Sequence, residues 1–131
     1  REPRDWDQVN HAMQLVMHDP RGIARAAAQG VQYRIAGKSG TAQVVAIKQG
    51  ERYNRLKTAE RNRDNALFVG FAPAEDPQIV ISVMIENGEA GGRVAGPVVR
   101  KVMDAWLLDN QGLLKPQYAS PQVKAHTTPH V

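Results

Sequence analysis

Apolar side chains near the start of the chain recur at helical spacing. Between residues 6 and 17 they return every three or four positions, and Asp5 followed by Gln8 resembles a capping box, so an amphipathic helix is predicted there. Residues 23–29 are rich in alanine and end at Gly30, which is typical of the residue that follows a helix. A second, short helix is therefore predicted over 23–29.

The middle of the chain carries strand-like patterns. Residues 33–47 are predicted as one long strand, while 66–71 and 79–85 are apolar at nearly every position. The short, turn-like stretch 73–77 favours an antiparallel pair, because a parallel connection needs about a dozen residues or more. Strands that are apolar on both faces are usually covered on both faces, so helices are expected on either side of the sheet.

A final helix is predicted from Pro97, a residue that the first helical turn tolerates, to about Asp109 and Asn110. Its apolar stripe, including Trp106, is expected to face the core. We expect an α+β fold with an antiparallel sheet flanked by helices in residues 1–112, followed by a tail over 113–131 that is expected to be mobile. The apolar stripe of this final helix comprises Val98, Val99, Val102, Met103, Trp106 and Leu107.

Length and composition add few constraints. A chain of 131 residues suits one domain, and its formal net charge of +4 favours acidic partners only mildly. It contains no cysteine, which rules out disulfides and thiolate metal sites within it. No apolar run reaches the roughly 18 to 20 residues that span a bilayer, and no signal peptide is present. The chain begins at Arg1 rather than methionine, so we expect it to be a piece of something longer.

The segment Gly37-Lys38-Ser39-Gly40-Thr41 carries the most informative chemistry. A phosphate-binding loop would need another glycine at position 32, where Gln32 stands, and a helix after the motif. The residues that follow Thr41 are instead rich in β-branched side chains, so the motif is predicted to lie in a strand. A phosphate-binding loop is therefore excluded.

Alternation along a strand places Ser39 and Thr41 on one face and Lys38 on the other. The two hydroxyls are then able to bind one ligand group, while Lys38, expected in a partly enclosed cleft, attracts a carboxylate. Gly40 leaves room for the backbone of a ligand. A free edge of this strand would bind an extended peptide as an added strand, and an exposed amide would form half of an oxyanion hole.

Other candidate sites are weaker. His11 and His18 are seven residues apart, too far for the usual helical metal pair, and His126 with His130 is interrupted by Pro129. We therefore predict neither a metal nor another cofactor. The charged stretch 48–65 is predicted to be a long exposed loop whose arginines and lysines are solvated.

The order of several segments resembles the penicillin-binding proteins, a class whose motif set includes a lysine-containing strand. The likeness is greatest to the class B transpeptidases of cell elongation in rod-shaped Gram-negative bacteria, and it runs from about Trp6 to Leu108. It rests on Tyr33-Arg34-Ile35-Ala36, the motif through Gln43, the run from Ala66 to Pro73, and Ile85-Glu86-Asn87-Gly88.

The resemblance implies a role for each residue of the motif. Ser39 and Thr41 would bind the terminal carboxylate of a D-alanyl-D-alanine stem peptide or of a β-lactam. The backbone amide of Thr41 would donate to the oxyanion, a contribution worth roughly 3 to 4 kcal/mol of barrier. Lys38 would supply positive potential beneath the site, and Gly40 belongs to the same substrate-binding strand.

Two family motifs are missing from this chain. The nucleophile of the family lies in Ser-x-x-Lys and a second motif reads Ser-x-Asn, but none of the three serines, Ser39, Ser82 and Ser120, fits either. We therefore expect the chain to be the C-terminal part of a transpeptidase domain, with an incomplete sheet and no activity of its own.

The resemblance also implies partners and a location. The expected partners are the stem peptide, β-lactam antibiotics, the N-terminal part of the same protein and the cell-elongation machinery, without nucleic acid. The expected location is the periplasmic face of the bacterial inner membrane, with the anchor upstream of this chain.

Two other functions stay open at this point. A serine β-lactamase shares the lysine-containing strand but hydrolyses the drug quickly instead of keeping it as an adduct. A polyanion-binding module would use the basic stretch from Arg52 to Arg63, and its binding would fall steeply with salt.

Overall fold

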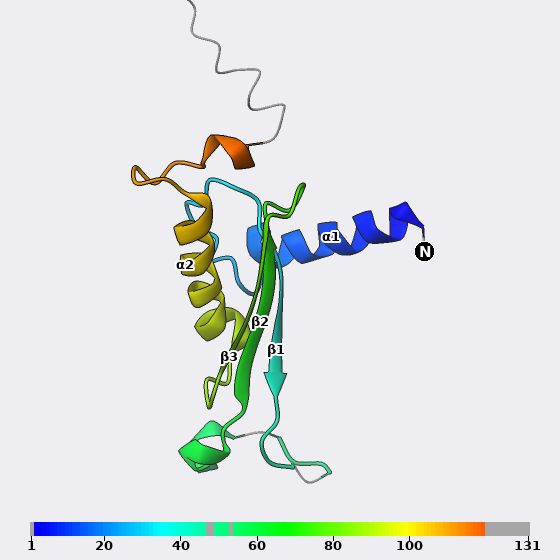
Figure 1. Ribbon diagram of the computed structural model, residues 1–131. Coiled ribbons are helices and arrows are strands. Elements are labelled where there is room, and N and C mark those ends of the chain that lie inside the picture. The colour runs from blue at the N-terminus through cyan, green and yellow to red at the C-terminus, as the bar shows by residue number, and fades with distance from the viewer. Residues whose placement is uncertain (1, 47–48, 53, 120–131) are drawn as a thin grey trace, which may run out of the picture.

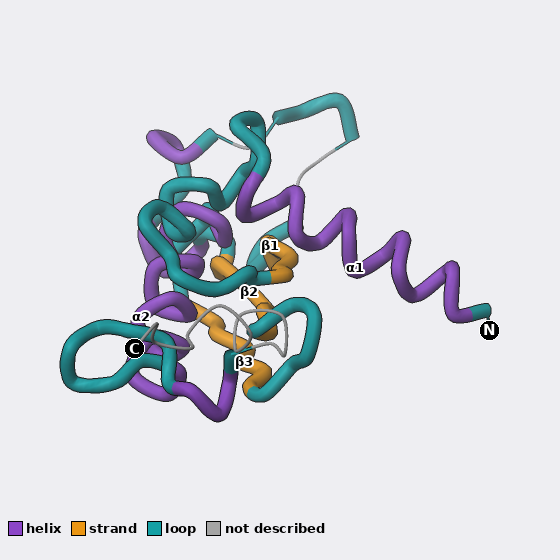
Figure 2. Tube along the Cα trace, turned by 90° about the horizontal axis from the view of Figure 1, so that it is seen from above, coloured by secondary structure: helices purple, strands orange, loops and turns teal. Residues whose placement is uncertain are grey.

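The computed structural model of the chain describes residues 2–46, 49–52 and 54–119 (Figures 1 and 2). Its framework consists of two α-helices and three strands. In chain order they are α1 (Pro3–His18), β1 (Ala36–Ala42), β2 (Asn65–Ala72), β3 (Ile79–Ile85) and α2 (Gly96–Leu107). Short 3₁₀ turns cover Arg55–Lys57, Glu60–Asn62 and Pro116–Tyr118, and a π-helical turn, Gly91–Ala95, leads into α2.

The three strands form one antiparallel sheet in the order β1-β2-β3. Gly40 pairs with Leu67, which pairs in turn with Met84 on the third strand. The antiparallel β2–β3 pair confirms the prediction from the short 73–77 turn. The predicted α+β class, an antiparallel sheet flanked by helices, is also confirmed.

The main core lies between the sheet and α2, which runs along one face of the sheet (Figures 1 and 2). Phe68 on β2 is 2% exposed, and Val99, Met103 and Leu107 on α2 are fully buried. Each such side chain contributes roughly 1.5–3 kcal/mol through burial, so this contact holds the helix against the sheet. Of the helices that the structure describes, none combines the length and apolar character needed to cross a bilayer.

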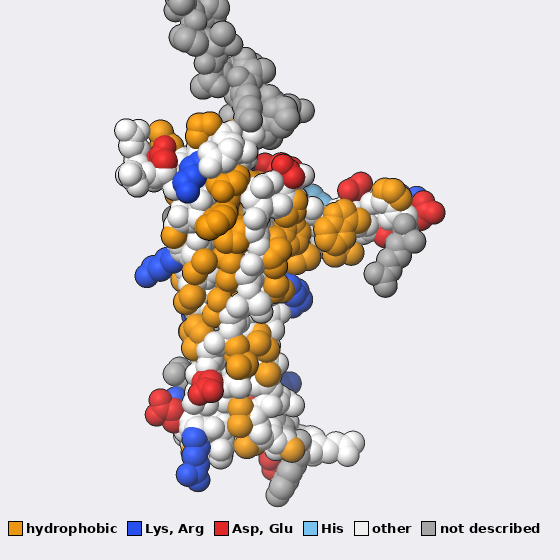
Figure 3. Space-filling view, in the orientation of Figure 1, with side chains coloured by type: hydrophobic (Ala, Val, Ile, Leu, Met, Phe, Trp, Pro, Cys, Tyr) orange, Lys and Arg blue, Asp and Glu red, His pale blue; other side chains and the backbone are white. Residues whose placement is uncertain are grey.

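The opposite face of the sheet is only partly covered. Trp6 and Met13 of α1 pack near Phe71, and the rings of Trp6 and Phe71 stack with centroids 6.3 Å apart. Val80 and Met84 on β3 remain 67% and 59% exposed, and hydrophobic side chains reach the surface along the sheet region in Figure 3. Within the described residues, the expectation that helices cover both faces is therefore met fully on one face only.

The two predicted N-terminal helices differ from those observed. Helix α1 begins at Pro3, with Glu2 as a cap residue that makes no side-chain capping bond, so the capping box at Asp5 is wrong. Proline is favoured in the first turn of a helix, and α1 accordingly begins at Pro3, upstream of the start that was predicted at Asp5. Residues 23–30 form successive turns rather than a helix, with bonds three residues apart such as Ala27 N to Ala24 O.

The predicted long strand is shorter than expected. Strand β1 ends at Ala42, which pairs with Asn65, the first residue of β2. Beyond that point no partner strand remains on this side, and β-branched residues such as Val44 and Val45 lie in an exposed bend. Strand length is thus limited by the partner and not by local propensity.

Helix α2 carries apolar side chains on more than its core face. Trp106 is 53% exposed, so its predicted core position is wrong, and Val98 and Val102 are exposed with it. Residues 99, 103 and 107 recur every four positions and are buried against the sheet. Residues 98, 102 and 106 each lie one position earlier and form a neighbouring, exposed row on the helix.

The segment after α2 turns back onto the helix. Leu114 forms an isolated bridge with Leu108, and Leu114 and Tyr118 pack against the main core. The remainder of the predicted tail, 120–131, lies outside the described residues.

Candidate functional site

The motif lies in β1, which among the described strands pairs only with β2. Ser39 is opposite Phe68 and Lys38 is opposite Val69. Because directly paired residues share a face, Ser39 and Thr41 lie on the core side and Lys38 lies on the other side. This alternation agrees with the prediction from the sequence.

Lys38 borders a shallow groove of about 300 Å³. Its side chain is exposed, and Nζ donates a hydrogen bond to the carbonyl oxygen of Ser39. The expected partial enclosure is therefore not provided by the described residues. The other residues of the groove are Ser39, Gly40, Leu67, Phe68, Val69 and Ser82.

The hydroxyl of Thr41 is held by the segment that follows β3. Thr41 Oγ1 donates to the backbone oxygen of Glu89 at 3.2 Å, although the residue itself is exposed. A hydroxyl has one proton to donate, so Thr41 must leave this bond before it donates to a carboxylate. Ser39 is half-buried, and its hydroxyl makes no such bond to another described residue.

The two glycines of the motif have different surroundings. A Cβ on Gly37 would lie 2.6 Å from the ring of Phe68, so Gly37 makes room for the protein's own core. A Cβ on Gly40 would meet only Leu67, at 3.3 Å from its Cβ. Of the two, Gly40 is the glycine with space for a ligand beside the strand.

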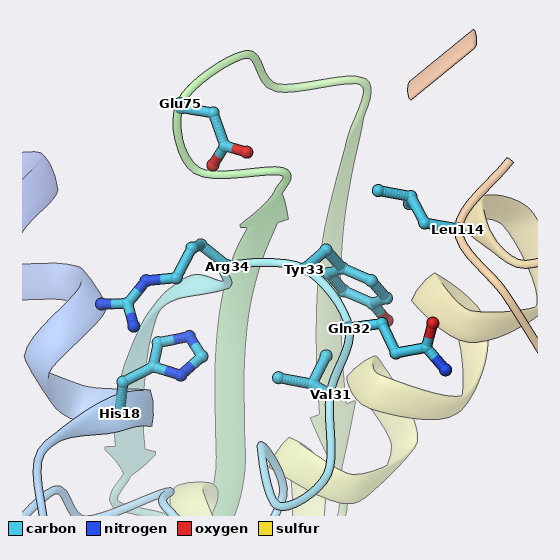
Figure 4. Close-up of a pocket in the computed structure, with 7 residues that line it drawn as sticks. All are labelled: His18, Val31, Gln32, Tyr33, Arg34, Glu75 and Leu114. Atoms are coloured by element: carbon cyan, nitrogen blue, oxygen red, sulfur yellow. The ribbon is translucent and has the colours of Figure 1, made fainter. Parts of the chain in front are cut away.

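A separate pocket of about 340 Å³ lies at the entry to β1 (Figure 4). His18 Nε2 accepts the backbone N–H of Ile35 at 2.9 Å, and burial together with the charge of Arg34 lowers the pKa of His18. Tyr33 Oη donates to Asp104 Oδ1 at 2.6 Å, and burial raises the pKa of Tyr33. These bonds hold the chain that leads into β1. The pocket is lined by His18, Val31, Gln32, Tyr33, Arg34, Glu75 and Leu114.

Neither of the two described histidines belongs to a group of metal-binding side chains. His11 is exposed on α1, and His18 is engaged with Ile35. No group of three or more metal-binding side chains occurs among the described residues. His126 and His130 lie outside them.

Sequence reasoning missed the contact that the segment after β3 makes with the motif. Glu89 contacts β1 at Thr41, and Gly91 contacts it at Gly40. A glycine pair such as Gly91-Gly92 is typical of a close approach between backbones, but it does not indicate that the partner is Gly40, about fifty residues away.

The charged stretch between β1 and β2 contains two 3₁₀ turns and is mostly exposed in its described part. Its end is tied to the segment after β3, because Glu89 N donates to Asp64 O at 2.9 Å and Arg63 lies 4.0 Å from the Glu89 carboxylate. The basic stretch is thus partly used within the chain.

Comparisons with known proteins agree with this arrangement. A family model described as the penicillin binding protein transpeptidase domain matches residues 2–104. Over 95% of its length the chain is 38% identical to the peptidoglycan D,D-transpeptidase MrdA of Haemophilus influenzae, and it spans 18% of that relative.

Solved structures give the same picture. A crystal structure of Pseudomonas aeruginosa penicillin-binding protein 2 in complex with WCK 5153 is 53% identical, with a TM-score of 0.77 over 92% of this chain and 24% of that one. A Helicobacter pylori penicillin-binding protein 2, solved with MreC, is 24% identical with a TM-score of 0.62 over 79% of this chain and 17% of that one, which shows a shared fold.

These matches confirm the resemblance to the class B proteins of cell elongation, and they do not favour a β-lactamase or a polyanion-binding module. The chain therefore belongs to the penicillin-binding protein transpeptidase family.

Proposed function

We propose that the intact protein is a peptidoglycan D,D-transpeptidase that works through a serine acyl-enzyme, and that this chain is the C-terminal part of its transpeptidase domain. The observation that carries the proposal is the position of Lys38-Ser39-Gly40-Thr41 on a strand with one unpaired edge among the described strands. An unpaired edge offers backbone donors and acceptors to an extended peptide.

Each motif residue has a role at this edge. Ser39 binds the carboxylate of the stem peptide or of a β-lactam, and Thr41 joins it when its hydroxyl leaves Glu89 O. The amide of Thr41 donates to the developing oxyanion, where a preorganised donor is worth most. Gly40 admits the ligand backbone, and Lys38 adds positive potential from the other face.

The attacking serine comes from outside this chain. None of its serines lies in a Ser-x-x-Lys pattern, so the chain on its own is expected to be inactive. The N-terminal part of the same protein is the proposed source of the nucleophile, its lysine and the Ser-x-Asn motif.

The proposed partners follow from the family and its members. Binding of β-lactams follows from the family to which the chain belongs. The Helicobacter pylori relative was solved with MreC, which supports a place in the cell-elongation machinery. We place the intact protein at the periplasmic face of the bacterial inner membrane.

The test is acylation of the full-length protein by a fluorescent penicillin. We expect a long-lived covalent adduct, and we expect Ser39→Ala to slow its formation roughly tenfold or more, because a hydrogen bond to a charged group is lost. Thr58→Ala, which removes a hydroxyl from the stretch between β1 and β2, should acylate at nearly the normal rate. Rapid hydrolysis of the drug would point to a β-lactamase instead, and a protein that never reacts but binds DNA would refute the enzyme assignment.

A further inference from the structure

The first residue of the π-helical turn, Gly91, lies against the backbone of the motif strand. A Cβ at this position would lie 2.1 Å from Leu67 O and 2.6 Å from Gly40 O. Both distances are shorter than 3.0 Å, the closest contact that Cβ atoms make in protein structures. Gly91 is not one of the described glycines with positive φ, so space and not backbone conformation demands glycine here. Any other residue at 91 must therefore displace either the turn or the strand.

The segment from Asn87 to Gly91, here called the post-β3 turn, also holds the next residue of the motif. Its Glu89 accepts the hydroxyl of Thr41 through the backbone oxygen at 3.2 Å. Asn87 and Glu89 both have left-handed backbones, with φ of 57° and 63°, a conformation that asparagine tolerates but that is uncommon for glutamate. The post-β3 turn is thus held in a defined shape beneath Gly40 and Thr41.

The turn is anchored at several points that do not belong to β1. Asn87 N donates to Asn65 Oδ1 at 3.0 Å, and Glu89 N donates to Asp64 O at 2.9 Å. A Cβ on Gly92, the residue that follows the turn, would lie 3.0 Å from Ile23 O, so the chain is also closely packed where the turn ends. The turn has little room to move away from the sheet.

The strands differ in how easily they yield. Leu67 lies on β2, which pairs with a strand on each side, whereas Gly40 lies on β1, which pairs on one side among the described strands. The contact of an added methyl group with Gly40 O is therefore relieved by a shift of β1, whereas its closer contact with Leu67 O is relieved by displacing the turn, which is bonded to Thr41 through Glu89 O. To reach the 3.0 Å limit, the 2.6 Å contact with Gly40 O needs a shift of about 0.4 Å and the 2.1 Å contact with Leu67 O a shift of about 1 Å.

We propose that Gly91 is a positioning residue for the active site, and that its missing side chain lets the post-β3 turn seat β1 so that Gly40 and Thr41 meet the ligand in the reactive geometry. The inference rests on the proposed function, because it assigns Gly91 to the same site. A misplacement of about 1 Å costs roughly 10²-fold in rate at a catalytic centre.

The test uses the full-length protein with Gly91→Ala and, as matched control, Gly96→Ala. A Cβ on Gly96 would meet Ala27 Cβ at an ordinary 3.5 Å. The measured quantities are the rate constant of acylation at saturating penicillin, the melting temperature, and amide hydrogen exchange over residues 36–44. We expect Gly91→Ala to acylate roughly 10²-fold more slowly with faster exchange over 36–44, and Gly96→Ala to resemble the wild type.

A second control separates positioning from loss of stability. Val99→Ala leaves a cavity under α2, at a fully buried residue away from Gly40, and should lower the melting temperature while the folded protein keeps its acylation rate. If Gly91→Ala and Val99→Ala lose acylation in proportion to their loss of stability, the proposal is wrong. It is equally wrong if Gly91→Ala acylates within about threefold of the wild type.

Failure of the proposed function gives a different result. A wild type that penicillin does not acylate refutes the enzyme assignment, and hydrogen exchange over 36–44 still decides whether Gly91 positions β1, since unchanged exchange in Gly91→Ala overturns that. If Gly91→Ala does not fold, Asn65→Ala removes one anchor of the turn without adding atoms. It should raise exchange over 36–44 and slow acylation, and normal values of both would overturn the inference.

Discussion

Lys38 and Ser39 are neighbours in sequence but face opposite sides of β1. Lys38 borders a groove with Val69 and Ser82, while Ser39 and Thr41 lie on the side of α2 and the post-β3 turn. A ligand that runs along the edge of β1 reaches both sides, because the side chains of an edge strand flank its unpaired backbone. Charge and hydroxyl groups are thus able to act on one ligand from two directions.

Replacing Lys38 with alanine in the full-length protein should slow acylation by penicillin roughly 10²-fold, because one electrostatic contact to the reacting groups is lost. The melting temperature should change little, since the side chain is exposed in this chain and supports no core. The matched control is Lys101→Ala, an exposed lysine on α2. Acylation of Lys38→Ala at the rate of this control would remove Lys38 from the site.

At the scale of elements, a single imidazole joins α1 to β1. His18 is the last residue of α1, and its Nε2 accepts the N–H of Ile35, the residue directly before β1. Only a neutral imidazole has this acceptor. Burial and the nearby Arg34 lower the pKa of His18, and Glu75 lines the same pocket.

The stability of this connection should depend on pH. With a folded pKa below the unfolded value of about 6.5, the unfolded state binds protons first, so stability is complete above about pH 6.5 and is lost as pH falls toward the folded pKa. His18→Gln keeps an acceptor oxygen but does not titrate. As the pH is lowered from 6.5, we expect the melting temperature of the wild type to fall more than that of His18→Gln. An equal fall in the two proteins would contradict this account.

At the scale of the whole molecule, the sheet has an apolar face that α1 covers only in part, and an unpaired edge strand on each side among the described residues. The chain spans 18% of the length of its Haemophilus influenzae relative. An exposed apolar face of this kind usually marks a contact with another part of the protein or with a partner. We assign it to the N-terminal part of the same protein.

Met84→Arg on β3 tests that assignment in the full-length protein. If the N-terminal part covers this face, an unpaired buried charge costs about 3 kcal/mol, and the melting temperature falls accordingly. The control Gln78→Arg places the same charge at an exposed position beside β3. Equal melting temperatures for the two variants would show that the face remains open in the intact protein.

Local pattern was sufficient for α2, the β2–β3 hairpin and the alternation of Lys38 with Ser39, because helical period, strand period and turn composition are properties of neighbouring residues. It was sufficient for the family as well, through the motif and its flanking segments. It was insufficient where a distant partner sets the outcome: β1 ends at Ala42 because β2 begins at Asn65, and the alanine-rich segment 23–30 turns instead of forming a helix.

Side-chain environments depended on tertiary structure most of all. Trp106 shares the apolar pattern of Leu107, yet only Leu107 faces the sheet, because the angle at which α2 packs chooses one of two adjacent apolar rows. Gly91 carries no local sign of its contact with Gly40, since a close approach of two backbones exists only once the segments are folded together. Residue order thus specified the chemistry of the motif, and long-range packing decided how its backbone is held.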